Sequence, residues 1–349
     1  MTSCPKKQKF WPRMAAPLLT SAGIALVAAL TGAPALAMEI TPFRVVNMSP
    51  LVQIFGLPVP DSARVLQPNQ GEVSLSVNLA NNFAIDENNH EAITLDGETY
   101  RGALDLRYGL ARRFEAGIEI PVVAQSGGFL DGFIEWFHRT FGFNNGGRDE
   151  VPRDRLLYRY ERDGSDRLVM DDGGVGLGDI RLTGGMQLYD EQTEAPRSLS
   201  LRAALKLPTG NSHKLRGSGS VDFSLWLNGS DDFRLGPAGH MTIFGSAGGT
   251  VMSDGDVLKD QQRNLAAFGA AGFGWSPADW IALKAQALWH TSLYRDSELR
   301  ELGNDTIMGT IGGTLAFTER TSLDLGVSED LSVKTAPDVT FNFALHHRF

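Results

Sequence analysis

The sequence contains almost no cysteine. Cys4 is the one cysteine in 349 residues, and it precedes the apolar run 15–30, whereas a lipid-modified cysteine would follow such a run. The rest of the chain has no thiol, which excludes disulfide bonds and thiolate metal sites there. The seven histidines show neither H-x-x-H nor H-E-x-x-H spacing. We therefore expect no zinc site and no cofactor.

Two further shortages limit the function. After residue 37 no stretch of about twenty apolar residues occurs, so no transmembrane helix is predicted. Basic residues are also few, because 32 Lys and Arg stand against 41 Asp and Glu, for a net charge of −9. Such an acidic chain is not expected to bind nucleic acid. No G-x-S-x-G or similar motif supports a hydrolase, so we do not expect an enzyme.

Residues 1–37 contain the three parts of a secretory signal peptide. A basic stretch without acids precedes the apolar run 15–30, and Ala35-Leu36-Ala37 is a small-residue cleavage site. We expect cleavage near Ala37, which removes four basic residues and leaves 28 against 41 acids, a net charge of −13. A retained membrane anchor is the alternative, but the run is short and is interrupted by Pro17.

Residues 38–70 contain five prolines, which cannot donate to a strand ladder. We interpret this segment as an extended periplasmic lead or as a plug in the lumen of a barrel. Its middle part, 49–58, is too apolar for a free tail and is expected to pack against other residues.

From residue 71 onward the chain alternates between apolar and polar residues, which is typical of strands with two different faces. The last segment shows this best, with Val339, Phe341, Phe343, Leu345 and Phe349 on one face and His347 as the exception. Twelve strands are predicted, at 72–80, 99–110, 113–122, 177–189, 198–207, 219–229, 239–251, 263–275, 279–290, 305–317, 321–329 and 338–349.

The connections indicate how these strands are arranged. Those after odd-numbered strands are long and polar, such as 81–98 and 291–304, whereas most of the others are tight. Long outer loops that alternate with short periplasmic turns are typical of bacterial outer-membrane barrels. The predicted fold is all-β, a closed antiparallel transmembrane barrel over 71–349, with ten or fourteen strands as alternatives to twelve.

Charged residues recur at strand positions opposite the apolar face. Lys and Arg facing lipid near the bilayer midplane cost about 2–4 kcal/mol each, so these residues must line a lumen. The candidate solute-contacting residues are Arg101, Asp105, Arg107, Glu115, Glu119, Asp179, Arg181, Arg202, Lys206, Asp222 and Lys284. Like charges on opposite strands repel, so we expect the register that places Arg107 opposite Glu115 over the one that places Asp105 opposite Glu119.

The segment 124–176 is far longer than an ordinary loop. Apolar residues recur there at three- and four-residue spacing, which predicts an amphipathic helix over 129–141 in an extracellular loop. Three roles are open for this helix. It closes the barrel mouth as a structural element, it lines a gate or an apolar substrate groove, or it lies on the outer leaflet of the membrane. The candidate gate residues are Phe129, Phe133, Ile134, Phe137 and Phe141.

The strand start Gly176–Leu182 (G-L-G-D-I-R-L) and the segment Leu205–Asn211 (L-K-L-P-T-G-N) resemble parts of outer-membrane barrels linked to aromatic-degradation operons. The S-P-L and G-L-P tripeptides of the lead, Phe137–Asp149 (F-H-R-T-F-G-F-N-N-G-G-R-D) and the G-L-G-D start are more closely similar to an uncharacterised proteobacterial outer-membrane family, DUF3187. The resemblance implies the barrel fold and the outer membrane, but no substrate.

Together these features predict a monomeric barrel in the Gram-negative outer membrane, surrounded by lipid and acting as a passive or gated channel for uptake of small solutes. The terminal strand with Phe349 is expected to carry the signal for the barrel assembly machinery. The alternative is a non-conducting barrel, either a lipid-directed enzyme or a structural or adhesive surface protein.

Overall fold

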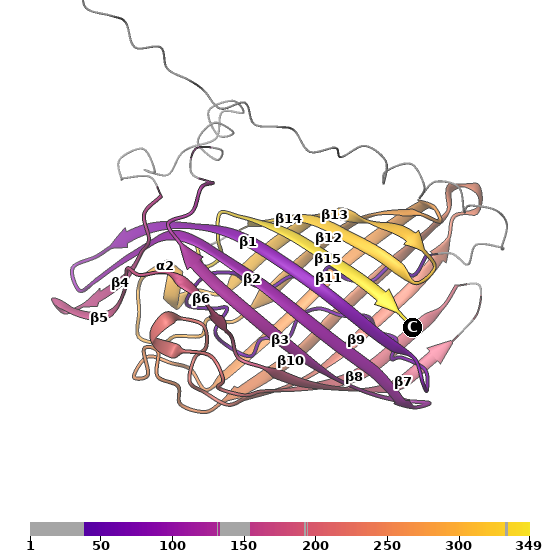
Figure 1. Cartoon of the computed structure of the whole chain (residues 1–349), viewed down its shortest axis with the longest axis horizontal. Helices are drawn as coiled ribbons and strands as arrows, with labels where there is room; N and C mark the ends of the chain where they lie inside the picture. Colours follow the sequence, from indigo (N-terminus) through magenta and orange to yellow (C-terminus); the bar gives the residue numbers. More distant parts are fainter. Residues whose placement is uncertain (1–37, 131, 133–153, 192, 194, 332–333) are drawn as a thin grey trace, which may run out of the picture. The chain divides into compact units, whose positions relative to one another are not determined.

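The computed structural model describes residues 38–349 except 131, 133–153, 192, 194 and 332–333. Twelve antiparallel strands form its wall (Figure 1). They are β1 (Gly71–Glu87), β2 (Glu91–Ala111), β3 (Phe114–Ser126), β7 (Arg181–Glu191), β8 (Arg197–Lys206), β9 (Asp222–Arg234), β10 (His240–Met252), β11 (Leu265–Ala278), β12 (Ile281–His290), β13 (Thr306–Thr318), β14 (Thr321–Asp330) and β15 (Val339–Arg348).

The wall is closed, because every one of these strands pairs with two others. Successive strands pair along the chain, β3 pairs with β7, and β1 pairs with β15 from Glu72–Arg348 to Asn81–Val339. At the closing seam the backbone groups of Gly71 and Phe349 exchange two hydrogen bonds, both 2.9 Å. The prediction of a closed, twelve-stranded antiparallel barrel is confirmed.

The two ends of the barrel differ. The turn end has the short connections, such as 112–113, 279–280 and 319–320, and holds Gly71 and Phe349. The loop end has the long ones, which contain a four-residue helix, α2 (Arg300–Gly303), and a 3₁₀ turn, η2 (Ser212–Lys214). A second 3₁₀ turn, η3 (Gly236–Ala238), lies at the turn end. No helix among the described residues is long and apolar enough to cross a membrane.

Three short strands extend the sheet beyond the wall at the loop end. β4 (Leu157–Arg162) pairs with the first residues of β2, β5 (Ser165–Met170) pairs with β4, and β6 (Gly174–Leu177) pairs with the last residues of β3. Figure 1 shows β4 and β5 projecting beyond the other strands. The expected long loop 81–98 is wrong, because β1 and β2 continue as a hairpin that turns at 88–90.

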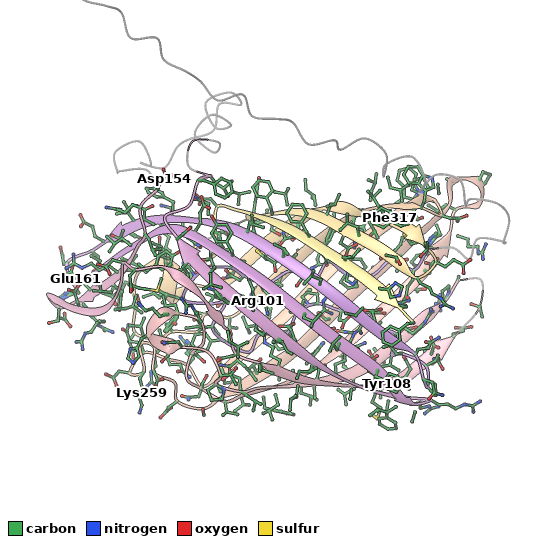
Figure 2. All side chains as sticks on the ribbon, in the orientation of Figure 1. Arg101, Tyr108, Asp154, Glu161, Lys259 and Phe317 are labelled. Atoms are coloured by element: carbon green, nitrogen blue, oxygen red, sulfur yellow. The ribbon has the colours of Figure 1, made fainter. Side chains whose placement is uncertain are left out.

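The two faces of the wall match the apolar alternation. Leu75, Leu104 and Phe223 are exposed on the outside, at 51, 38 and 48 % of their surface. Tyr108 and Phe317 lie on the outer surface at the turn end, as Figure 2 shows. Because exposed apolar residues recur at alternating positions along nearly every strand, the outer surface is suited to acyl chains rather than to water.

The expected register between β2 and β3 is wrong. Asp105 pairs with Glu119, and Glu115 lies opposite Gly109 rather than Arg107. The two like charges tolerate this arrangement because arginines lie against both carboxylates. One arginine comes from outside the wall: Arg44 lies 3.1 Å from Asp105 and 3.6 Å from Glu119.

That arginine belongs to residues 38–70, which lie inside the barrel. We call this segment the plug and divide it into an ascending limb (38–50), a tip (51–56) and a descending limb (57–70). The ascending limb begins at the turn end and follows β12, with contacts to Lys284, Gln286 and then His290. The tip reaches the loop end, and the descending limb returns past β9 and β7 to Gly71.

Candidate functional site: the plugged lumen

The ascending limb is hydrogen-bonded to the inner face of β12. Lys284 donates to the carbonyl of Thr41 at 3.0 Å, and its ammonium lies 4.1 Å from the ring centre of Phe43. The side chain of Gln286 accepts from the backbone N–H of Phe43 at 2.9 Å and donates to its carbonyl at 3.2 Å. These hydrogen bonds from side chains of β12 take the place of strand-to-strand backbone hydrogen bonds. They hold the limb against β12 although it is not a strand.

Arg44 connects the plug to the charged side of the lumen. Its guanidinium lies within 3.2 Å of Asp61 in the descending limb, besides the contacts with Asp105 and Glu119. Its side chain is only 8 % exposed. Arg44 therefore joins the two limbs to each other and neutralises two acidic residues that face each other across β2 and β3.

Asp61 makes the complementary connection. Its carboxylate lies 3.0 Å from Arg107 and 3.7 Å from Arg202, in addition to Arg44. Arg202 also donates to the carbonyl of Ser62 at 2.9 Å. Arg44 and Asp61 thus each contact two oppositely charged wall residues, and such pairing offsets the cost of burying the charges.

The tip is bound through its backbone. Lys206 donates to the carbonyl of Ile54 at 3.2 Å and Arg181 donates to that of Phe55 at 3.1 Å. The N–H of Gly56 donates to Asp222 at 2.7 Å. A glycine is required here, because a Cβ on Gly56 would lie 2.7 Å from the Cβ of Asp222.

Residues of the loop end cover the tip. Tyr158, Tyr160 and Tyr294 are fully buried and belong to one apolar cluster with Leu51 and Phe55. The hydroxyl of Tyr294 donates to the carbonyl of Leu51 at 2.9 Å, and its ring packs edge-on against Phe55, with 5.8 Å between the ring centres. The mouth is therefore closed twice, by the tip and by the cap over it.

Glu301 is a buried acidic residue in this largely apolar cap. It is 3 % exposed, and neither carboxylate oxygen has a hydrogen-bond partner among the described residues. Burial raises the pKa of Glu301 to about 7, and the nearby carboxylate of Asp86 adds to the rise. The cap is therefore tightest when this side chain is neutral.

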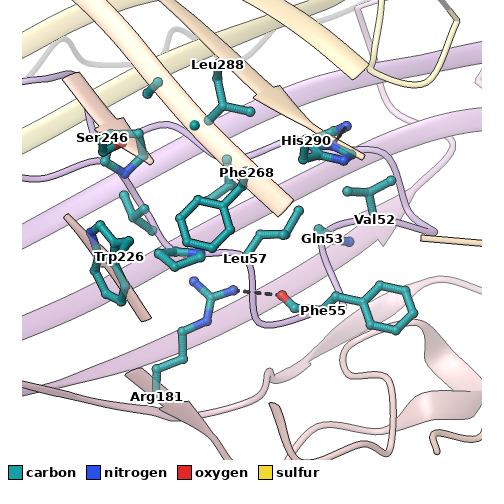
Figure 3. A pocket seen from close by; sticks show the side chains of 17 residues that line it. Val52, Gln53, Phe55, Leu57, Arg181, Trp226, Ser246, Phe268, Leu288 and His290 are labelled. Atoms are coloured by element: carbon teal, nitrogen blue, oxygen red, sulfur yellow. Dashed lines mark hydrogen bonds between the residues drawn. The ribbon is translucent and has the colours of Figure 1, made fainter. Parts of the chain in front are cut away.

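Two spaces lie beside the plug in the described part of the chain. One is a cavity of about 30 Å³, walled by Phe55 and Leu57 of the plug and by Trp226, Phe268 and Leu288 of the barrel (Figure 3). It has room for about two water molecules. The other, of about 430 Å³, lies at the turn end between the plug and strands β8–β11. Neither is a continuous passage of solute width.

All eleven candidate lumen residues are buried in the interior. Arg101, Asp105, Arg107, Glu115, Glu119, Arg181 and Arg202 form one network with Arg44 and Asp61; Asp179, Lys206 and Asp222 form a second group, and Lys284 pairs with Asp324. In this state they contact each other and the plug.

The gate residues Phe133, Ile134, Phe137 and Phe141 lie outside the described residues, as does the rest of the expected helix after Leu130 apart from residue 132. Phe129 is described. Its ring is 66 % exposed and its backbone N–H donates to Glu98 at 2.8 Å.

Sequence reasoning did not identify Arg44, Asp61 or the three cap tyrosines. The signal for the plug charges was weak, because single charges in a proline-rich segment give no periodic pattern. The apolar character of 49–58 indicated packing but not its partner. Tyr158 and Tyr160 lie in what was expected to be a polar loop, although both are buried in β4.

The fold and the charged, filled interior are those of an outer-membrane-type β-barrel. The chain belongs to the family described as "Protein of unknown function (DUF3187)", whose model matches residues 19–349. No curated protein is detectably related.

Among solved structures the chain is similar to the COG4313 outer membrane channel from Pseudomonas putida F1, with a TM-score of 0.53 and 13% identity over 84% of this chain and 100% of that chain. It is less similar to the translocator domain of the autotransporter NalP from Neisseria meningitidis, with a TM-score of 0.39 and 10% identity over 81% and 90% of the two chains. At these identities the likeness concerns the fold.

Proposed function

We propose that this protein is an outer-membrane channel for small solutes, closed at rest by residues 38–70. The turn end faces the periplasm and the loop end faces the outside. The proposal includes a monomer in outer-membrane lipid, cleavage of a signal peptide near Ala37, and recognition of the strand ending in Phe349 by the barrel assembly machinery.

One observation carries the proposal: the lumen is filled by a segment that contributes no strand to the wall. The plug is covalently joined to the barrel only through residue 70, and its contacts are hydrogen bonds, ion pairs and apolar packing. A twelve-stranded barrel encloses more space than the packed eight-stranded type and less than a sixteen-stranded porin. Removal of the plug therefore opens a narrow, charged passage.

In the open state the lumen-lining residues become the solute contacts. Their two signs suit small polar or weakly charged solutes, since an ion of either sign finds both attraction and repulsion along the path. The candidate gate residues at 129–141 add a second control at the loop end in this proposal.

Planar-bilayer recording tests the channel. We expect rare openings from the full chain and steady, larger conductance from a chain lacking 38–66. A matched control uses Val65→Cys with Gly185→Cys, because a Cβ on Gly185 would lie 3.2 Å from the Cγ1 of Val65. The oxidised pair holds the descending limb against β7, and openings should return on reduction. No conductance without the plug would contradict a channel and favour the non-conducting alternative.

A further inference from the structure

The space of about 430 Å³ at the turn end, which we call the vestibule, has a size typical of small-molecule sites. One part of its lining comes from the plug, through Met38, Ile40 and Ser62. The other comes from the barrel, through strands β8–β11. A molecule bound there touches both parts at once.

His240 is the chemically unusual residue of this lining. Its Nδ1 lies 2.8 Å from Asp232, and Thr242 donates to the same carboxylate oxygen at 2.7 Å. Because a carboxylate accepts, Nδ1 carries the hydrogen of this contact, which leaves Nε2 of the imidazole as an acceptor. His240 lines the vestibule and is 8 % exposed, and its Nε2, which is itself buried, has no partner among the described residues.

The charges of the vestibule argue against an anionic ligand. Its lining has three carboxylates, Glu39, Asp232 and Asp279, against the guanidiniums of Arg64 and Arg234. Arg64 already pairs with Asp190 at 3.3 Å, and the carboxylate of Glu39 is paired with Arg348. An added carboxylate would therefore meet an excess of acidic side chains.

An apolar surface lies beside the histidine. Phe244 and Ile40 are buried together in a small cluster with Ala282, and Met38 packs against them. We propose that the vestibule binds a small neutral molecule with an apolar body and one hydroxyl group, which donates its hydrogen to Nε2 of His240. The body covers the cluster of Ile40 and Phe244.

Binding of this ligand is coupled to the plug. The site is complete only while residues 38–42 and 62–64 are in place, so the ligand binds the closed state better than the open one. A ligand with such a preference shifts the equilibrium toward the closed state. This coupling rests on the proposed channel function, whereas the binding itself does not.

Calorimetric titration of the full chain in lipid nanodiscs tests the binding, with cyclohexanol as the probe and methylcyclohexane as the matched molecule without the hydroxyl. We expect cyclohexanol to bind about tenfold more tightly, the value of one hydrogen bond in a buried site. Two substitutions separate the ring nitrogens. His240→Asn retains a donor to Asp232 but has no group at Nε2, so binding should weaken about tenfold. His240→Gln has an amide oxygen near Nε2 and should bind as wild type does.

Equal binding of the two probes by wild type, or equal affinity of wild type and His240→Asn for cyclohexanol, would overturn the site. If His240→Asn does not fold, the comparison of the two probes on wild type decides. A chain lacking 38–66 should lose at least about tenfold in affinity, and unchanged affinity would overturn the coupling. A barrel that conducts but does not bind cyclohexanol would contradict the vestibule site and leave the channel proposal intact. A barrel that binds cyclohexanol and never conducts would contradict the channel proposal and leave the site intact.

Discussion

Asp105 and Glu119 face each other across β2 and β3, and arginines of both the wall and the plug lie against them. Opposed like charges cost free energy unless a cation lies between them. Arg44 is one of these cations, and it is the one that comes from the plug. An unfavourable wall pair is thus a binding site for a plug residue.

Arg44→Gln should loosen the plug. Breaking a buried ion pair on one side costs about 3–5 kcal/mol, so openings in planar bilayers should become at least about a hundredfold more frequent. Adding Asp105→Asn should restore part of the closure, because it removes the repulsion left behind. Arg64→Gln is the control, since Arg64 is partly exposed and its ion pair among the described residues is with Asp190. Equal opening rates for the Arg44 and Arg64 variants would contradict the bridging role.

Glu301 makes the cap sensitive to pH. Its folded-state pKa, about 7, lies above the ordinary value of 4.5. The folded form therefore binds the proton more tightly, so stability is highest below pH 4.5 and falls as pH rises toward 7. The hydrogen-exchange protection of residues 291–305, which is the intrinsic exchange rate at each pH divided by the observed rate, should be lower at pH 8 than at pH 5. Glu301→Gln should raise this protection at pH 8 and remove its pH dependence; a pH-dependent protection that persists in Glu301→Gln would point to another group.

At the scale of elements, the hairpin in which β1 and β2 turn at 88–90 is a part of the wall that the sequence does not predict. In the membrane-level part of β1 and β2 apolar residues point outward, and that alternation predicted the strands. Beyond it the pattern inverts on β2, because Ile93 and Leu95 are buried on the inner side against the cap, whereas Ile85 of β1 still faces outward. The apolar outer face is therefore incomplete over 81–98, and the sequence predicts a loop there.

The sequence predicts the plug only as one of two alternatives, an extended lead or a plug in the lumen. Its contacts are backbone groups and single charges spread over distant strands, and no local pattern specifies them. The alternation of the wall, by contrast, repeats twelve times and marks the inward charges residue by residue.

The tip is the element that closes the mouth, and Phe55 is its largest buried anchor. Phe55→Ala removes a side chain that is 1 % exposed, at a cost of about 3 kcal/mol or more. We expect more frequent openings and faster proteolysis at 51–56 in detergent. Phe273→Ala, on the lipid-facing side of β11 and 52 % exposed, should change neither. A silent Phe55→Ala variant would mean that the tip does not hold the plug.

At the scale of the whole molecule, closure depends on the seam between β1 and β15. A Cβ on Gly71 would lie 2.3 Å from the ring of Phe349. Gly71→Val should therefore reduce the yield of folded barrel. This yield is measured as the fraction of protein that keeps its compact electrophoretic mobility without heating. Phe349→Ala should reduce insertion into the membrane. Gly102→Val is the control on β2, because a Cβ there meets nothing within 4 Å. Equal yields for the two glycine variants would show that the seam tolerates crowding.

The plug precedes every wall strand in the sequence, and the seam that closes the wall joins β1 to β15, with Gly71 hydrogen-bonded to Phe349. The apolar tip therefore has no complete enclosure until β15 has been made and has paired with β1. Until then the tip must be shielded by something other than its own barrel, and a chain that stops before β15 would leave it as an exposed, aggregation-prone segment.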